Sequence, residues 1–342
     1  MVLASRYAGA NFMARTDLLP AVLPQEPPPP RTELNVADAR RLVKRYTALL
    51  DVYYTVDFLH NGLFVTHNDI KFDNVSVDAE REDRVTLIDF GVTSSVCPVP
   101  PPAHPHSRDH AQYAAAVAAA ALSQEQMAHD SQAVAAYDHA LALHMRAQAF
   151  FKVAKDYGPA ASDAHAEAIA PMLAEMTHYT DVDGAVPLSA RDISRSLPDL
   201  TSLVTAEKSY SVVGTPKYMS WQLLQTDEKK HIGGHNAFKS DVYALGVMLF
   251  VVALGGEPYS MTRQEDRPLA LQFLTAYGAR KLLEAMQRSS VMLPAEIDAL
   301  EGMLNPDENL RWGIKQAITA VETAVVELMN TLAAAGIDVQ GQ

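Results

Sequence analysis

One apolar segment constrains the fold more than any other part of this chain. Residues Lys239 to Leu254 have the length of one helix, and their polar side chains lie in the first turn. A helix that is apolar on every side has to be buried. Its longest apolar run, Val242 to Gly255, is shorter than the roughly 20 residues needed to cross a bilayer. We therefore expect a protein core around this helix and no membrane span.

The flanking sequence predicts amphipathic helices and one small hairpin. From Asn35, a capping residue, apolar side chains recur at spacings near 3.6 until Asn61-Gly62, which tolerate the left-handed backbone at a helix end. The strand-like runs 74–77 and 84–88 are separated by the charged stretch 78–83, as in a hairpin. Further amphipathic helices are expected at residues 269–286, 294–303 and 318–332.

The remaining segments differ in composition from these elements. Residues 1–20 hold short apolar pieces that we expect to form one or two strands, and the proline run 27–30 excludes a helix there. Residues 97–110 are rich in proline and histidine, and residues 111–178 are rich in alanine, which favours two or three helices. Residues 181–204 are polar, so we expect a loop.

Composition and charge narrow the class of protein. The chain has 342 residues, with 28 Lys and Arg against 41 Asp and Glu, which gives a net charge of −13. That balance argues against a nucleic-acid-binding surface, because such a surface needs clustered cations. The single cysteine, Cys97, rules out an internal disulfide framework and fits a reducing compartment, and we find no secretory signal. We expect an intracellular protein, cytoplasmic or nuclear, with no nucleic-acid or membrane partner.

Two polar segments bracket the predicted hairpin. The first carries His67, Asp69, Lys71 and Asn74 in the pattern His-x-Asp-x-Lys-x-x-Asn, and the second, Asp89–Gly91, reads Asp-Phe-Gly directly after the second strand. Either motif alone is weak, because such residues are common in polar loops. Together they resemble the catalytic loop and the metal-binding motif of the protein kinase family.

Three further blocks follow in the order that the family has. Gly214–Met219 resembles the segment that binds the acceptor residue, in which Thr215 would contact the catalytic loop. Lys239–Val247 resembles the start of the family's central buried helix, whose Asp241 would hold the backbone of the catalytic loop. Arg311 resembles the buried arginine near the end of the family's domain. The resemblance therefore extends over five blocks.

The resemblance implies an α+β, protein-kinase-like fold, mainly the α-helical C-terminal lobe. Residues 36–91 and 205–332 would form that lobe, and residues 1–35 a remnant of the small lobe and hinge. The stretch 92–204 is far longer than an activation segment needs, so we expect it to be an alanine-rich helical insertion.

The resemblance also implies roles for individual residues. Phosphoryl transfer needs a nucleophile aligned with the γ-phosphate and cations that offset the charge of its oxygens. Asp69, Lys71 and Thr215 would be catalytic, with Asp69 accepting or orienting the proton of the substrate hydroxyl. Lys71, Asn74 and Asp89 would bind ATP, and Asn74 and Asp89 would supply the oxygen ligands for Mg²⁺.

Several positions depart from the family pattern. Position 68, an arginine in the family, is Asn68, so the partner of a phosphorylated activation loop is missing. The acceptor segment ends in Ser-Trp-Gln where the family has Ala-Pro-Glu, so Arg311 would meet the neutral amide of Gln222. No glycine-rich loop and no strand lysine precede Asn35, and the first lysine is Lys44. The sequence before Asn35 could supply at most the last strands of a small lobe and its hinge.

Three functions are compatible with these residues. The first is a Ser/Thr protein kinase that transfers the γ-phosphate of ATP to a protein substrate. The second is a pseudokinase scaffold that binds a protein partner, which the missing nucleotide clamp favours and the intact catalytic residues oppose. The third is a small-molecule kinase of the choline or aminoglycoside type, whose catalytic loop can also read His-Asn-Asp. We rank it last because that group lacks the Gly-Thr-x-x-Tyr segment.

Overall fold

The structure, a computed structural model, describes residues 10–11, 29–78, 84–101, 124–157, 189–226, 233–255 and 291–339. These residues form helices and small antiparallel sheets, which confirms the α+β class. They divide between two compact units. The first unit comprises residues 1–57, 67–93 and 208–342, and the second comprises residues 58–66 and 94–207. The helix predicted at 269–286 lies outside the described residues, as does most of the predicted small-lobe remnant.

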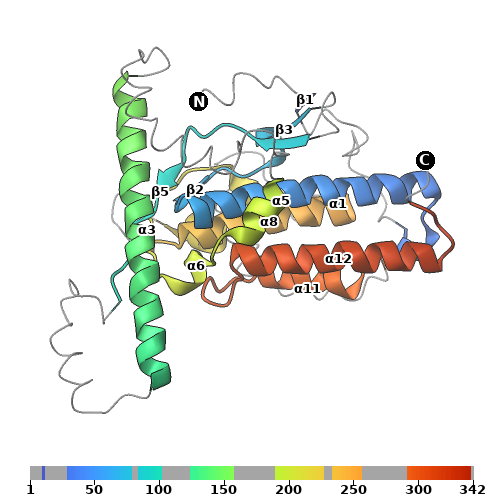
Figure 1. Ribbon diagram of the computed structural model, residues 1–342. Helices are drawn as coiled ribbons and strands as arrows, with labels where there is room; N and C mark the ends of the chain where they lie inside the picture. The colour runs from blue at the N-terminus through green and yellow to red at the C-terminus, as the bar shows by residue number, and fades with distance from the viewer. Residues whose placement is uncertain are drawn as a thin grey trace, which may run out of the picture. The chain divides into compact units, whose positions relative to one another are not determined.

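The core of the first unit is built around α8 (Ala237–Leu254). Three helices contact α8 and lie beside one another in Figure 1, namely α1 (Val36–Asp57), α11 (Pro294–Met303) and α12 (Ile314–Ala334). Every residue of α8 from Ser240 to Ala253 is buried, as its apolar sequence predicts. Because burying one large apolar side chain contributes about 1.5–3 kcal/mol, this helix is a major source of the unit's stability.

Both ends of α8 are set by local sequence. The side chain of Asn236 accepts a hydrogen bond from the backbone N–H of Lys239 at 3.2 Å, and Gly255 ends the helix with a φ of 72°. Among the described helices, α8 and α12 are long and apolar enough to cross a membrane, but 89% of the α8 window is buried inside the protein. The place of α8 in the core therefore explains its apolar composition.

Helix α1 also begins and ends where the sequence predicts. The side chain of Asn35 accepts a hydrogen bond from the backbone N–H of Asp38 at 2.9 Å. The helix runs on into a π-helical turn, η4 (Phe58–Gly62), which stops at the predicted glycine. The apolar residues that recur along α1 are buried, including Leu42, Tyr46, Leu49, Tyr53 and Val56.

The predicted hairpin is present in the first unit. Strands β3 (Val75–Asp78) and β4 (Arg84–Leu87) pair antiparallel with Val75 opposite Leu87, and β1 (Ala10–Asn11) pairs with the other edge of β3. A 3₁₀ turn, η5 (Phe72–Asn74), leads into β3. This register brings the residue before β3 and the residue after β4 to the same end of the hairpin, where both polar segments lie.

The second unit contains a long helix and a short sheet. Strands β2 (Val65–Thr66) and β5 (Ser94–Ser95) pair antiparallel, and α3 (Gln124–Tyr157) contacts β5. Helix α3 is the described part of the alanine-rich stretch in which we expected two or three helices, and the rest of that stretch lies outside the described residues. The small side chains of Ala136 and Ala140 are buried on one face of α3.

The loop predicted for residues 181–204 is wrong over its last part. The structure has two short helices there, α5 (Ala190–Ser196) and α6 (Leu200–Leu203). Ser189 and Asp192 form a reciprocal capping box at the start of α5, with backbone N–H bonds of 3.2 and 3.3 Å to each other's side chains. Side-chain caps stabilise such a short helix although its sequence lacks a long apolar periodicity.

Candidate active site

Three predicted catalytic residues form a closed set of hydrogen bonds in the first unit. The ammonium group of Lys71 lies 2.7 Å from Oδ2 of Asp69 and donates to Oγ1 of Thr215 at 2.8 Å. The hydroxyl of Thr215 in turn donates to Oδ1 of Asp69 at 2.8 Å. Asp69 and Thr215 are 146 residues apart in sequence, so the tertiary structure brings them together. The contacts expected of Thr215 are present.

Asn74 contacts the same carboxylate. Its side-chain N–H₂ donates to the backbone carbonyl of Asp69 at 2.8 Å and to Oδ2 of Asp69 at 3.1 Å. The residue is 5% exposed, and it lies in the turn η5 at the start of the hairpin. Because the amide nitrogen points toward Asp69, the amide oxygen Oδ1 is the atom that Asn74 offers to a further partner.

The loop that carries Asp69 is anchored from α8. The carboxylate of Asp241 accepts hydrogen bonds from the backbone N–H groups of His67 and Asn68 at 2.8 and 2.9 Å. Asp241 is 2% exposed, and Asn68 has a left-handed φ of 65°. A buried carboxylate with two backbone donors holds this unfavourable loop conformation in place. This is the contact expected of Asp241.

His67 connects the loop to the end of the hairpin. Its Nδ1 accepts a hydrogen bond from the backbone N–H of Asp69 at 3.3 Å, so its Nε2 carries the proton and donates to the carbonyl of Ile88 at 3.1 Å. Its ring lies against that of Phe90, with centroids 5.1 Å apart. Burial lowers the pKa of His67, although Asp241 opposes that change. His67 therefore acts here as a neutral structural bridge.

Asp89 lies at the same end of the hairpin as Asn74. The backbone N–H of Ile88 donates to the carbonyl of Asn74 at 2.8 Å, which places Asp89 one residue beyond that pair. Asp89 is exposed and has a φ of 62°. Its Oδ1 accepts a hydrogen bond from the backbone N–H of Gly91 at 3.4 Å. The positive φ is a backbone conformation that non-glycine residues rarely adopt.

The oxygen donors of Asn74 and Asp89 fit a hard divalent cation. Magnesium is commonly held by one or two protein oxygens together with phosphate and water. No group of three His, Cys, Asp or Glu side chains among the described residues is arranged to hold a metal ion by itself. Asn74 and Asp89 could therefore supply part of the coordination of a magnesium ion, with the remaining ligands coming from outside this pair.

Gly214 allows the segment that carries Thr215 and the loop that carries Asp69 to approach each other. Its φ is 112°, and a Cβ atom at this position would lie 2.6 Å from the backbone oxygen of Asn68. Any other residue would force the segment that carries Thr215 away from the loop that carries Asp69. The turn η7 (Pro216–Tyr218) follows directly.

The environment of Asp69 keeps its carboxylate ionised. Partial burial raises its pKa, but hydrogen bonds from Lys71 and Thr215 outweigh that effect, so the pKa lies below the ordinary aspartate value. The side chain of Asp69 is 13% exposed and lines a small pocket that is partly open to solvent. A charged acceptor oxygen is therefore accessible from the pocket.

His235 lines the same pocket, and no sequence pattern points to it. It is 2% exposed, and no described residue forms a hydrogen bond with its Nδ1. Burial lowers its pKa to about 4, although Glu308 and Asp241 act in the opposite direction. His235 stands alone between Gly233-Gly234 and the helix cap Asn236, so no motif in the sequence marks it as part of a site.

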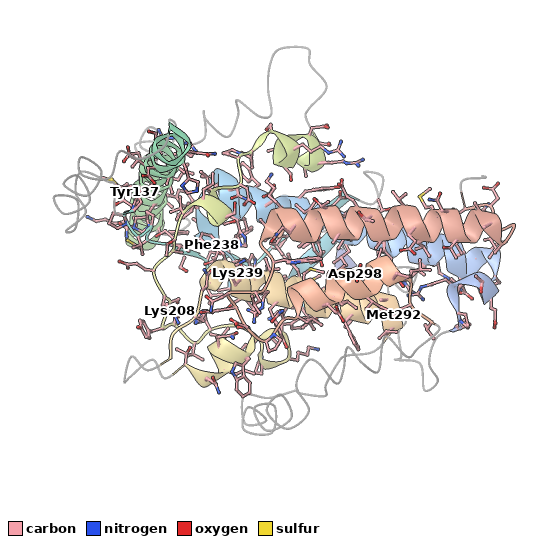
Figure 2. The ribbon with its side chains drawn as sticks, turned by 90° about the horizontal axis from the view of Figure 1, so that it is seen from below. Tyr137, Lys208, Phe238, Lys239, Met292 and Asp298 are labelled. Carbon is pink, nitrogen blue, oxygen red and sulfur yellow. The ribbon has the colours of Figure 1, made fainter. Side chains whose placement is uncertain are left out.

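Arg311 meets a neutral amide, as the sequence predicts. Its guanidinium donates to Oε1 of Gln222 in α7 (Trp221–Gln225) at 2.9 Å and to the carbonyls of Lys239 and Asn305 at 3.1 and 2.9 Å. Figure 2 labels Lys239 in the first turn of α8. Arg311 is 1% exposed, so it fastens three segments of the first unit together.

No protein-family model matches this chain, and no curated protein matches it either.

Proposed function

We propose that the first unit is a phosphotransferase of the protein kinase type, which transfers the γ-phosphate of ATP to a Ser or Thr hydroxyl of a protein. The observation that carries this proposal is the hydrogen-bonded set of Asp69, Lys71 and Thr215, with its loop held by Asp241. An ionised carboxylate, an ammonium group and a hydroxyl gathered in this way have no packing role that apolar residues would not fill better.

Asp69 would orient the acceptor. Its lowered pKa keeps it ionised, so one of its oxygens can accept the hydrogen bond of an incoming hydroxyl. A base with a low pKa is weak, and a general base is most effective when its pKa lies near the working pH. Asp69 therefore aligns the hydroxyl and takes up its proton late in the reaction, when the oxygen has become more acidic.

Lys71 and Thr215 would complete the acceptor end of the site. The ammonium group of Lys71 already joins Asp69 to Thr215, and it lies where it can offset negative charge on a transferred phosphoryl group. Thr215 keeps Asp69 in place by donating to its second oxygen. Asn74 and Asp89 would hold Mg²⁺, which when bound neutralises phosphate charge. The resemblance assigns Lys71, Asn74 and Asp89 to ATP.

A pseudokinase scaffold is the second candidate. One sequence observation favours it, since residues 1–43 contain neither a glycine-rich loop nor a lysine. A nucleotide held without those groups loses at least one charge-assisted contact, which costs about ten- to a hundredfold in affinity. The scaffold and the enzyme therefore differ in phosphate transfer, and both predict that any nucleotide binding depends on the metal.

The test measures nucleotide binding and phosphate transfer separately. Thermal unfolding of the full chain with ATP should shift upward only when MgCl₂ is present, and Asp89→Asn should remove that shift. Asp73→Asn is the matched control, because Asp73 is an exposed carboxylate in the turn η5, next to Asn74. Incorporation of labelled phosphate into Ser or Thr of casein or myelin basic protein would support the enzyme. Metal-dependent binding without transfer would support the scaffold, and binding that survives Asp89→Asn would overturn both.

A further inference from the structure

The segment that carries Thr215 differs in charge from the rest of the chain. Residues 208–226 contain Lys208 and Lys217 and no Asp or Glu, whereas the whole chain has a net charge of −13. This segment includes the turn η7 and helix α7, and it forms part of the wall of the pocket beside Asp69. This segment therefore brings two cations and no carboxylate of its own to a pocket whose lining includes Asp69 and Asp241, on a chain that is acidic overall.

Lys217 lies close to the point where an acceptor hydroxyl would meet Asp69. It follows Thr215 by two residues, and Oγ1 of Thr215 is 2.8 Å from Oδ1 of Asp69. Two residues of chain span at most about 7 Å. The ammonium group of Lys217 lies 5.4 Å from the centroid of the Tyr218 ring. A peptide with its hydroxyl at Asp69 therefore places its neighbouring side chains within reach of Lys217.

Lys208 adds a second cation at the start of the segment. Its side chain is 57% exposed, and its Nζ lies 3.5 Å from Oε1 of Glu308. The other oxygen of Glu308 accepts a hydrogen bond from the backbone N–H of Asn236 at 2.9 Å. An ion pair with so exposed a lysine contributes little, so Lys208 can turn to a carboxylate of a bound peptide at small cost. Figure 2 labels Lys208 on the chain that precedes α7.

The backbone of this segment is fixed before any ligand binds. Ser209 and His235 exchange two backbone hydrogen bonds of 2.8 and 2.9 Å, and Gly214 lies against the loop of Asp69. Of the carboxylates that line the pocket, Asp69 is paired with Lys71, and Asp241 accepts from two backbone N–H groups. Because the backbone that carries Lys208 and Lys217 is already ordered, binding an acidic partner costs less conformational entropy.

We infer that the acceptor protein carries Asp or Glu residues beside its Ser or Thr, and that Lys217 is the main residue that selects them, with Lys208 assisting. This inference rests on the proposed function, since it names the substrate class of that same site. Complementary charge of this kind acts mainly on association and weakens as salt rises.

The experiment compares peptides that differ only in charge. A Ser peptide flanked on both sides by Glu should have a KM about three- to tenfold lower than the same peptide flanked by Gln, with kcat little changed, and 0.5 M NaCl should reduce the difference. Lys217→Glu should remove or invert the preference, and Lys208→Ala should reduce it less. Lys152→Glu, at an exposed lysine of α3, is the matched control and should change nothing.

Peptide binding, followed by fluorescence anisotropy, separates this inference from the proposed function. Preferential binding of the Glu peptide that Lys217→Glu abolishes, without phosphate transfer, would support the inference and count against the enzyme. Phosphate transfer that ignores peptide charge would overturn the inference and leave the enzyme standing. A preference that survives Lys217→Glu would overturn the assignment of Lys217, and no binding of either peptide would overturn the inference.

Discussion

Two carboxylates in the first unit each gather donors from distant segments, and they differ in exposure. Glu296 in α11 is 0% exposed and accepts hydrogen bonds from Arg31, from the hydroxyl of Tyr46 and from the backbone N–H of Leu293. Asp69 accepts from Lys71, Thr215 and Asn74, yet it keeps 13% of its side-chain surface open beside a pocket.

The difference in exposure distinguishes a structural carboxylate, which holds segments together, from one that a substrate can reach. Arg31, in the 3₁₀ turn η3 (Arg31–Glu33), also donates to the carbonyl of Ala253 at 2.8 Å, so the Glu296 cluster ties the approach to α1 to the end of α8. An enclosed carboxylate of this kind can only hold segments together. A carboxylate that is paired but still open can accept one more hydrogen bond, as a reaction with a substrate hydroxyl requires.

The largest effect is expected for Asp69→Asn. The amide cannot take up a proton, so phosphate transfer should fall by about 10²- to 10⁴-fold. The melting temperature should change little, because an amide of the same shape can accept from Lys71 through its oxygen and donate to Oγ1 of Thr215 through its N–H₂ group. Initial rates and thermal unfolding, measured on the same preparation, check both parts. A large fall in melting temperature together with the loss of activity would show that Asp69 has a structural role like that of Glu296.

Glu296→Ala should have the opposite effects, because it should lower the stability of the first unit and leave phosphate transfer unchanged. Removing one partner of a buried ion pair leaves Arg31 charged and unpaired, which costs about 3–5 kcal/mol of unfolding free energy. Urea denaturation measures that loss, and phosphate transfer by the fraction that remains folded should be unchanged. The double variant Arg31→Met/Glu296→Ala should recover part of the stability, because it removes the unpaired charge. No recovery would contradict the pairing.

His235 should make the stability of the first unit fall in mild acid. That fall should occur at a higher pH than the loss of the stabilisation that Asp69 contributes. Burial holds its pKa at about 4, against about 6.5 in the unfolded chain. The stabilisation is therefore complete above pH 6.5 and is lost as the pH falls toward 4, because the unfolded chain binds the proton more readily. The loss amounts to about 3 kcal/mol. Asp69, with a lowered pKa, loses its contribution only below the ordinary aspartate value.

Urea denaturation at a series of pH values checks this assignment. His235→Asn should flatten the decline between pH 6.5 and 4, although His67, whose pKa is also lowered by burial, contributes in the same range. His139→Asn, at an exposed position on α3, should leave the profile of the first unit unchanged. An equally steep decline in His235→Asn would rule out His235 as its source.

The smallest effect is expected for Gln222→Glu, which would give Arg311 a carboxylate and so create a second pair like that of Arg31 and Glu296. A charge-assisted hydrogen bond exceeds a neutral one by about 1 kcal/mol, but the new carboxylate is desolvated and loses the bond that the Gln222 amide donates to the Pro306 carbonyl, and both effects oppose that gain. Urea denaturation should therefore show a gain of at most about 1 kcal/mol. Gln225→Glu, at an exposed position of the same helix, is the control and should give no gain.

Much of the fold of the first unit could be predicted because its patterns are local. The apolar run of α8, the periodicity of α1 and the two strand-like runs of the β3–β4 hairpin each lie within one stretch of sequence. The residues around Asp69 were found through motif order, which is also readable along the chain. The short helices α5 and α6 were missed because a capping box, and no apolar period, marks the start of α5.

By itself the sequence determined the main helices and the hairpin of the first unit, that α8 would be buried, and which polar residues were candidates for chemistry. Tertiary structure alone decided which carboxylate would be enclosed and which would stay open. Glu296 and Arg31 are 265 residues apart, and nothing in either local sequence marks them as a buried pair. Burial and pairing depend on what neighbouring segments bring to a side chain, and the free energy of a charged group depends on both.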